Sequence, residues 1–308
     1  MPGQDAAAAV QRMQDYVETH LHDPITLINL AKEAGYSPWH AARMFRETTG
    51  KAPFDYIRAR RLTQAALQLR DLKPRVADVA LDFVFDSQEG FTRAFSKAFG
   101  IPPARYSRQT PAIRLFMPRK ALDIYRAFNN KEEKNMSENS RSIFVQVIRR
   151  QQRKLLLKRG LKAKDYFEYC AECGCDVFDT LTSVKEALYE PAGLWLPGHL
   201  IPEGTSQYVQ GVELPLDYDN PLPEGFEIIT LQPCQYMVFQ SEPYDDERFM
   251  DEISSVWGHI GRFDPKVYGY AWAPEDAPRL QLEPQGCRGY IEAWPVKEMA
   301  SQREGTAI

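Results

Sequence analysis

The stretch SPWHAARMF at residues 37–45, closed by Gly50, decides the fold because the chain carries it twice. The second copy is SQEGFTRAF at residues 87–95, closed by Gly100. The same offset of fifty positions also pairs Pro53 with Pro103 and Tyr56 with Tyr106. An offset shared by so many positions indicates a duplicated structural unit.

Each copy has the pattern of a short helix with one apolar side. A serine stands first and can cap the free backbone amides, and Pro38 in the first helical turn loses no internal hydrogen bond. The inner faces at helical spacing are Ala41, Met44, Phe45 and Thr48 in the first copy, and Phe91, Ala94, Phe95 and Ala98 in the second. The outer stripes are Trp39, Arg43 and Arg46, and Glu89, Arg93 and Ser96, flanked by Thr92 and Lys97.

A shorter helix and a tight turn precede each copy. The first predicted pair is 27–34 with a turn at 35–36, and the second is 76–83 with a turn at 84–86. Two helices joined in this way form a helix-turn-helix, in which the second helix reads DNA. The alternative is a small helical bundle whose outer faces are only solvated. We favour the DNA-reading interpretation because the cap, the turn and the outward arginine are all duplicated.

Residues 6–108 resemble the DNA-binding domain of the AraC/XylS family of bacterial transcription regulators. The resemblance lies in LAKEAGYS at 30–37, RMFR at 43–46, ALD at 80–82, FDSQ at 85–88 and FTRAF at 91–95, with FGIPP at 99–103. One departure is Val84, which stands where the family usually has glycine in the second turn. The resemblance implies that the two reading helices enter successive major grooves on one face of DNA.

These patterns predict the residues that contact DNA. Arg43 and Arg93 are expected to read bases, because a guanidinium pairs with guanine in two places. Arg58 and Arg61, on a long helix predicted for 53–70, are expected to bind phosphate. The full predicted set is Ser37, Trp39, His40, Arg43, Arg46, Arg58, Arg61, Gln88, Glu89, Thr92, Arg93 and Lys97.

Charge is spread unevenly over the 308 residues. Residues 1–126 hold 19 Lys and Arg against 13 Asp and Glu, and the remainder holds 19 against 29. A basic front half is suited to a polyanion such as DNA. The chain has no apolar run of 18 residues and no N-terminal targeting pattern, so we expect a cytoplasmic protein without a membrane partner.

The five cysteines predict neither a disulfide framework nor a metal centre. Cys170, Cys173 and Cys175 lie close together, but no fourth ligand follows at a zinc-like spacing. We interpret them as packing residues and expect no metal and no cofactor.

The composition predicts three parts of the chain. Residues 5–108 form the double helix-turn-helix domain, 109–142 form a connector and polar linker, and 143–297 form a second domain. The linker is placed there because residues 129–140 are polar, with almost nothing to bury. Beyond it the pattern predicts strands at 144–150, 193–200 and 207–214 around a helix at 164–173. The order recurs with strands at 226–240, 267–272 and 288–294 around a helix at 246–263.

The fold class is therefore multidomain, an all-α domain followed by an α+β domain of duplicated strand-helix-strand-strand units. This order, with the ending GYIEAWPV at 289–296, resembles the GyrI-like ligand-binding domain. The resemblance implies a cleft for amphipathic, often cationic, small molecules. Together the two domains resemble the Rob-like branch of the AraC family.

Alternation along two late strands predicts the ligand site. Tyr268, Tyr270 and Trp272 share one face, and Tyr290, Glu292 and Trp294 share another, so that five aromatic rings would surround one carboxylate and attract a delocalised cation. The alternative is an aromatic core packed on the helix at 246–263. The predicted ligand-binding set is Trp195, Tyr208, Tyr236, Tyr268, Tyr270, Trp272, Tyr290, Glu292 and Trp294.

The sequence thus predicts a one-component transcription regulator and not an enzyme. Its expected partners are double-stranded DNA, a small effector and RNA polymerase, and both a monomer and a dimer remain open. The alternative function is hydrolysis of a reactive small toxin, which some GyrI-like proteins perform, with a cleft carboxylate as general base.

Overall fold

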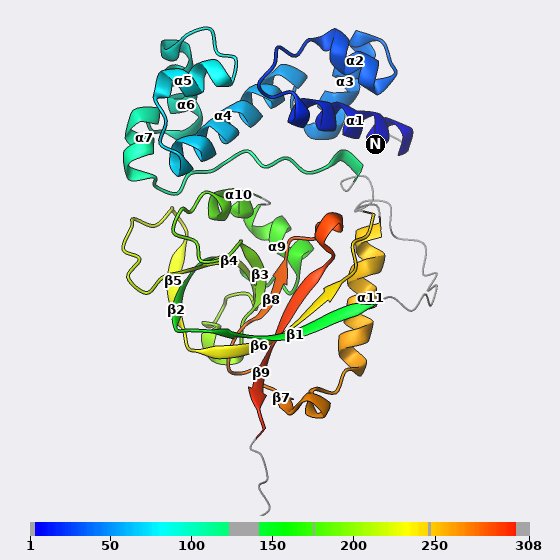
Figure 1. The fold of residues 1–308 in the computed structure, drawn as a ribbon, viewed down its shortest axis with the longest axis vertical. Helices are drawn as coiled ribbons and strands as arrows, with labels where there is room; N and C mark the ends of the chain where they lie inside the picture. Colours follow the sequence, from blue (N-terminus) through cyan, green and yellow to red (C-terminus); the bar gives the residue numbers. More distant parts are fainter. Residues whose placement is uncertain (1–3, 123–141, 175, 246–247, 300–308) are drawn as a thin grey trace, which may run out of the picture. The chain divides into compact units, whose positions relative to one another are not determined.

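The computed structural model describes residues 4–122, 142–174, 176–245 and 248–299 (Figure 1). The chain divides into two compact units, residues 1–137 with 183–185, and residues 138–182 with 186–308. The predicted linker at 129–140 and Cys175 lie outside the described residues. Among the described helices, none is long and apolar enough to cross a bilayer.

Seven helices form the described part of the first unit, and they pack around two apolar clusters. They are α1 (Gln4–Thr19), α2 (Leu27–Ala34), α3 (Pro38–Thr49), α4 (Pro53–Asp71), α5 (Val76–Asp82), α6 (Gln88–Phe99) and α7 (Pro103–Gln109). One cluster joins α1, α2, α3 and the start of α4, and the other joins the rest of α4 with α5, α6 and α7. The long helix α4 therefore belongs to both halves.

The two sequence copies form matching helices. Ser37 Oγ accepts a hydrogen bond from the His40 amide, and Ser87 Oγ accepts one from the Gly90 amide. Both helices end at a glycine in the left-handed region, Gly50 at φ +73° and Gly100 at φ +70°. The repeated tyrosines are fully buried and contact the repeated phenylalanines, with ring centroids 5.1 Å apart for Phe45 and Tyr56 and 5.6 Å for Phe95 and Tyr106.

The inner faces follow the predicted pattern except at Ala98. Ala41, Phe45, Phe91 and Phe95 are fully buried. Ala98 is exposed and the half-buried Phe99 packs on the core in its place, because α6 ends at Phe99 beside Phe95.

The second turn places Val84 in a conformation that suits glycine. The amide of Val84 bonds to the Leu81 carbonyl and that of Phe85 to the Ala80 carbonyl, which is the pattern that ends a helix with a left-handed residue. Val84 accordingly has φ +59°, and Gly35 holds the corresponding place in the first turn at φ +75°. A β-branched residue there stores strain that glycine would avoid.

Residues 111–122 pack along the helical unit, although the sequence assigned them to a connector. Ile113 and Leu115 are buried, and Ala121 is fully buried. The Phe116 amide donates to Thr63 Oγ1 on α4 at 2.8 Å, and the Ala121 amide donates to Gln14 Oε1 on α1 at 2.8 Å. This segment, the strap, contributes to both apolar clusters.

The second unit has one antiparallel sheet with helices. Its first half contains β1 (Ile143–Arg150), β2 (Arg153–Arg159), α9 (Tyr166–Cys173), α10 (Val177–Thr182), β3 (Ala192–Trp195), η1 (Gly198–Leu200) and β4 (Tyr208–Leu214). Its second half contains β5 (Glu227–Leu231), β6 (Cys234–Ser241), α11 (Phe249–Arg262), η3 (Pro265–Tyr268), β7 (Tyr270–Trp272), β8 (Arg279–Leu282), η4 (Gly286–Arg288) and β9 (Ile291–Glu298).

The strand order of the sheet supports an internal duplication. The order is β1-β6-β9-β8-β3-β4-β2-β5, with β7 paired to β9 beside this path. Exchanging β1 with β5, β2 with β6, β3 with β8 and β4 with β9 reverses the order and leaves it otherwise unchanged. The first strand of each half pairs with the second strand of the other half, so the halves are interlaced.

The predicted strand-helix-strand-strand unit was wrong in detail. Each half begins with two strands before its helix, because β2 was missed and β5 and β6 were merged into one strand. The short strand β8 was also missed, and residues 265–268 form a 3-10 helix rather than the start of a strand. The residues between β5 and β6 are only Gln232 and Pro233, so a sequence pattern shows little interruption there.

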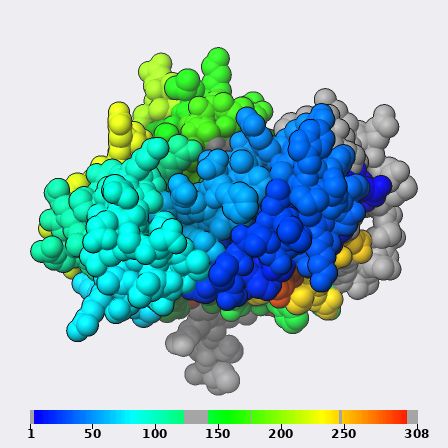
Figure 2. Space-filling model, turned by 90° about the horizontal axis from the view of Figure 1, so that it is seen from above, coloured from blue at the N-terminus to red at the C-terminus, as the bar shows by residue number. Residues whose placement is uncertain are grey.

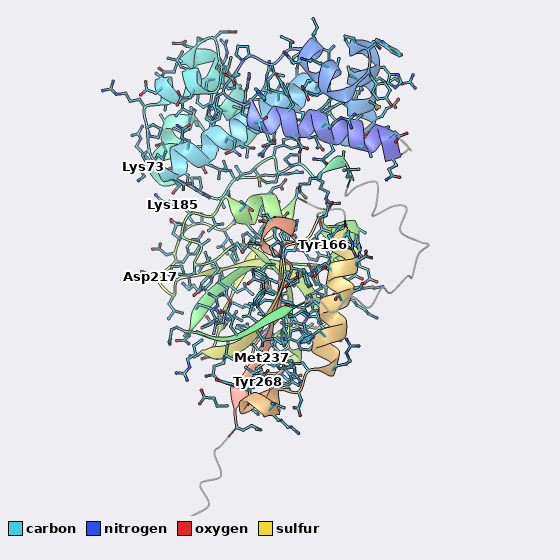
Figure 3. All side chains as sticks on the ribbon, turned by 45° about the vertical axis from the view of Figure 1, so that its right-hand side comes forward. Lys73, Tyr166, Lys185, Asp217, Met237 and Tyr268 are labelled. Carbon is cyan, nitrogen blue, oxygen red and sulfur yellow. The ribbon has the colours of Figure 1, made fainter. Side chains whose placement is uncertain are left out.

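The helix α11 packs on one region of this sheet through an apolar cluster. Met237 and Phe239 of β6 meet Ile253, Val256 and Ile260 of α11 in that cluster. Figure 3 shows Met237 in the packed interior and Tyr268 at the periphery, in agreement with exposures of 1% and 62%. The neighbouring residues Tyr236 and Val238 belong to a different cluster, because side chains alternate along β6.

Candidate functional site

The helices α3 and α6 present the predicted DNA-reading residues on the helical unit. In Figure 2 the half with α1–α3 is blue and the half with α5–α7 is cyan, and both lie on the face in view. Of the predicted residues, Ser37, Trp39, His40, Arg43, Arg46, Gln88, Glu89, Arg93 and Lys97 are exposed and Thr92 is half-buried. Trp39 has 70% of its surface exposed, which is far more than a packing role requires.

The two outward arginines have different surroundings. Arg43 Nε donates to Glu47 Oε1 at 2.8 Å, and its guanidinium lies 5.7 Å from the centre of the Trp39 ring. That hydrogen bond lowers the pKa of Glu47 and raises the pKa of Arg43. In α6 the position four residues after Arg93 is Lys97, so the repeat replaces an acid with a base. The two helices therefore differ in charge at the same place.

Three neighbouring arginines of α4 differ in burial, since Arg58 is exposed, Arg61 is half-buried and Arg60 is buried. Arg58 is exposed, as a phosphate contact requires. Arg61 donates to the carbonyls of Leu21 and Asp23, at 2.9 and 2.6 Å, so its guanidinium is bound to the loop between α1 and α2. Arg60 is buried and pairs with Glu18 through two contacts of 2.7 Å. The proposed DNA surface does not include Arg61, because its guanidinium already donates to backbone carbonyls of the chain.

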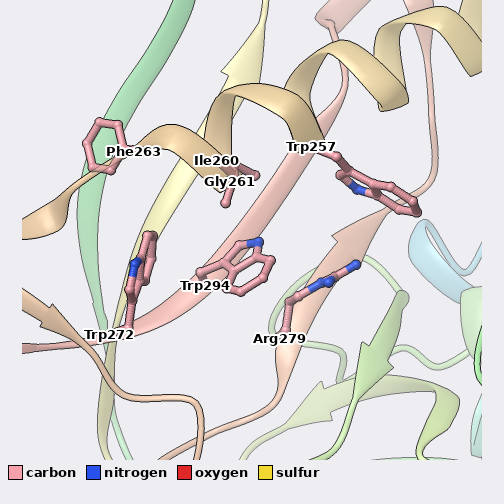
Figure 4. Close-up of a pocket in the computed structure, with 7 residues that line it drawn as sticks. All are labelled: Trp257, Ile260, Gly261, Phe263, Trp272, Arg279 and Trp294. Carbon is pink, nitrogen blue, oxygen red and sulfur yellow. The ribbon is translucent and has the colours of Figure 1, made fainter.

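In the second unit, a cavity of about 370 Å³ lies beside α11 (Figure 4). Trp272 and Trp294 come from β7 and β9, Trp257 comes from α11, and Arg279 begins β8. The lining residues are Trp257, Ile260, Gly261, Phe263, Trp272, Arg279 and Trp294. In Figure 4 Trp294 stands between Trp272 on one side and Arg279 with Trp257 on the other.

Glu292 is fully buried beside this cavity, and donors surround its carboxylate. Oε2 accepts from Tyr290 Oη at 2.8 Å and from Trp257 Nε1 at 2.5 Å. Oε1 accepts from Trp294 Nε1 at 2.8 Å and lies 2.7 Å from Arg279 Nε. Burial and the neighbouring carboxylate raise the pKa of Tyr290 well above its ordinary value, so its hydroxyl remains a donor.

Arg279 lies among tryptophan rings. Its guanidinium carbon is 3.8 Å from the centre of the Trp195 ring, 4.8 Å from Trp294 and 5.6 Å from Trp257. Trp195 is directly opposite Arg279 in the pairing of β3 with β8. The ring centroids of Trp272 and Trp294 are 5.6 Å apart. Trp195, Trp257, Trp272 and Trp294 therefore form one cluster, which holds four of the five tryptophans of the chain.

Five of the nine predicted ligand residues lie in this cluster, namely Trp195, Trp272, Tyr290, Glu292 and Trp294. A sixth, Tyr208, packs edge-on against Trp195, with the ring centroids 4.9 Å apart. Tyr270 borders the α11 cluster, and Tyr268 stacks on Phe263 beside a second hollow. Tyr236 lies in the other cluster, where Arg153 Nη2 donates to its hydroxyl at 3.4 Å. Arg153 itself pairs with the buried Glu213 at 2.7 Å.

The predicted ligand set lacks five of the residues that line the cavity, namely Trp257, Ile260, Gly261, Phe263 and Arg279. Two of these five, Trp257 and Arg279, contact Glu292. Trp257 lies on α11, is 45% exposed, and donates from its indole nitrogen to Glu292. Arg279 was missed with its strand. The signal for it was the alternation of Arg279 and Gln281 with Leu280 and Leu282, which is typical of a half-buried strand.

Of the cysteines that the structure describes, Cys170, Cys173 and Cys234 are half-buried and Cys287 is exposed. Cys173 Sγ donates to the Arg159 carbonyl at 3.4 Å, and burial raises the pKa of its thiol. Among the residues that the structure describes, no three His, Cys, Asp or Glu side chains are grouped as metal ligands.

Comparison with known proteins gives matches to the helical unit. Residues 30–109 match the family model described as a helix-turn-helix domain. The transcriptional regulator Rob of Salmonella typhimurium is 46% identical over 106 residues, which are 34% of this chain and 37% of that protein. The multiple antibiotic resistance protein MarA of the same species is 34% identical over 100 residues, 32% of this chain and 79% of MarA.

Among solved structures, the DNA-binding domain of AdpA, a global transcriptional factor in complex with a target DNA, is 25% identical. The match covers 40% of this chain and 97% of that one, with a TM-score of 0.31. The chain spans little more than a third of the length of Rob, but it covers more than two thirds of MarA. Through its helix-turn-helix unit the chain belongs to the AraC family of transcription regulators.

Proposed function

We propose that this protein regulates transcription by reading DNA with α3 and α6 and by binding a small effector in its second unit. The observation that carries the first part is the pair of capped helices, each with an outward arginine, in a unit with an excess of basic residues. Arg43 and Arg93 read base edges, and Gln88 and Glu89 at the start of α6 lie where base edges are nearest. Arg58 binds phosphate.

The test uses a DNA site selected by the protein from a random-sequence pool. Arg93→Ala should weaken binding to that site by about ten- to a hundredfold and binding to random DNA by far less. Arg43→Ala should act in the same direction, because Trp39 and Glu47 hold its side chain outward. Arg105→Ala is the matched control, since Arg105 is exposed on α7 and donates to Gln109. Equal losses on both DNAs would show that the arginines do not read bases.

The observation that carries the effector proposal is the tryptophan-lined cavity beside α11. Large aromatic faces bind flat amphipathic molecules, and each contact with a cation contributes roughly 0.5 to 2 kcal/mol. We expect amphipathic ligands to quench tryptophan fluorescence and to raise the melting temperature. Trp272→Ala should abolish both effects, whereas Trp39→Ala, in the other unit, should abolish neither. A wild-type protein that responds to no amphipathic compound contradicts the proposal.

The hydrolase alternative requires a carboxylate with a free lone pair for a proton. Both oxygens of Glu292 already accept hydrogen bonds from indole or hydroxyl donors, and its carboxylate forms an ion pair with Arg279. Such a carboxylate is a poor general base. A sensing role therefore fits the geometry better than turnover, and an interaction with RNA polymerase remains a prediction.

A further inference from the structure

Arg279 occupies the position in which an effector cation would be expected. Its guanidinium lies within 6 Å of three tryptophan ring centres, which is the range of an effective cation-aromatic contact. Its Nε is 2.7 Å from Glu292 Oε1. The aromatic faces and the anion that would hold a cationic ligand are thus already in contact with a cation of the chain itself.

The carboxylate offers nothing further while Arg279 is in place. Glu292 is fully buried, and three neutral donors, Tyr290 Oη and the indoles of Trp257 and Trp294, complete its hydrogen bonds. The ion pair makes the charge at this end of the cavity neutral. A cation entering from the cavity therefore gains the full attraction of Glu292 only when the guanidinium leaves.

Arg279 is placed so that it can leave. It is the first residue of the short strand β8, and its side chain is 23% exposed, whereas that of Glu292 is 0% exposed. Arg279 also lines the cavity, so the guanidinium has solvent and open space beside it. A change in side-chain rotamers moves the guanidinium without moving the strand, because four rotatable bonds separate it from the backbone.

We propose that Arg279 is an internal competitor for the effector site, and that planar organic cations bind by displacing its guanidinium from the tryptophan faces and taking Glu292 as their counter-charge. This inference rests on the proposed effector function and adds its selectivity. A ligand without positive charge has no means of replacing Arg279 at Glu292, and it binds only in the cavity alongside.

The experiment compares three ligands of one outline, namely the cation N-methylacridinium, neutral acridine and the anion acridine-9-carboxylate at pH 8. Calorimetry on the full chain should show that Arg279→Met binds the cation at least about tenfold more tightly than wild type, because the competitor is gone. Acridine should bind both proteins equally. The double variant Arg279→Met with Glu292→Gln should lose the gain, because the counter-charge is missing.

A second measurement covers the case in which Arg279→Met is unstable. Removing the guanidinium leaves Glu292 buried without its counter-ion, which lowers stability. Ethylguanidinium carries the missing group, so it should raise the melting temperature of Arg279→Ala and leave that of wild type unchanged. Absence of this rescue would contradict the proposal.

Two further outcomes separate the inference from the function on which it rests. Equal affinity of wild type and Arg279→Met for the cation, or preferential binding of the anion that is lost in Arg279→Met, would overturn the competitor role and leave an effector site. If none of the three ligands binds any of the proteins, the effector function itself fails, and the inference fails with it.

Discussion

Arg58 and Arg60, two residues apart on α4, should separate DNA binding from stability. Arg60→Met removes a buried guanidinium, with a side chain 7% exposed, and keeps most of its apolar stem. Arg58→Met makes the same change at an exposed position on the same helix. The pair therefore controls for helix propensity and for the loss of one positive charge.

The loss of folding stability expected for Arg60→Met follows from three contacts of the Arg60 guanidinium. Two of them join the Glu18 carboxylate at 2.7 Å, and the third joins the Phe116 carbonyl of the strap at 2.9 Å. The Glu18 side chain is 37% exposed, so solvent screens the ion pair and we assign it only about 1 kcal/mol. The charged hydrogen bond to the carbonyl contributes about 1.5 kcal/mol. Arg60→Met should thus lower the free energy of unfolding by about 2 to 3 kcal/mol.

Urea unfolding followed by helical circular dichroism measures the stability, and fluorescence anisotropy at several salt concentrations measures DNA binding. Arg58→Met should unfold at the wild-type urea concentration but reduce the salt dependence of binding by about 0.9 in the slope of log K against log salt. Arg60→Met should unfold at a lower urea concentration than wild type and leave the salt dependence of DNA binding unchanged. Equal effects of the two variants in either assay would refute the division of α4 into an inner and an outer arginine.

Three other predictions concern stability. Burial raises the pKa of Tyr106 to about 12, so the folded form keeps a proton that the unfolded chain loses above pH 10. The free energy of unfolding should therefore fall by roughly 2 to 3 kcal/mol as the pH rises from 10 to 12, and Tyr106→Phe should remove this part of the slope in alkaline denaturation curves. A helical unit ending at residue 109 should be less stable than one ending at 122 by about 4 kcal/mol in urea, because Ile113 and Leu115 of the strap lose their buried contacts, and equal stability would show that the strap does not support the fold. Val84→Gly should raise the melting temperature slightly, because relief of about 1 to 2 kcal/mol of left-handed strain exceeds the free-energy cost of the more flexible unfolded chain. Gly35→Ala should lower the melting temperature, although a Cβ at that position meets nothing within 4 Å.

The helical unit was predictable from sequence because its signals are local. Ser87 caps a helix that begins at the next residue, and Gly100 ends it, so spacing alone located α6. A turn at 84–86 was predicted as well, but the positive φ of Val84 was seen only in the structure.

The proposed effector site was only partly predictable, because strands distant in the sequence pair to build it. Alternation places Tyr290, Glu292 and Trp294 together, but nothing local shows that β8 brings Arg279 to them. The same limit applies to Tyr236, because the direction in which its side chain points depends on which face of β6 meets α11. The ion pair that neutralises Glu292 could be seen only once the strand order was known.

The interlaced strand order of the second unit has a consequence for the order of folding. Because β1 pairs with β6 and β5 pairs with β2, neither half can complete its sheet until the strands of the other half have been made. Pairings so distant in sequence form slowly, whereas the short-range helical contacts of the first unit form fast. The helical unit also leaves the ribosome first. A newly made chain therefore acquires its helix-turn-helix surface before its cavity, so DNA reading matures ahead of any response to a small molecule.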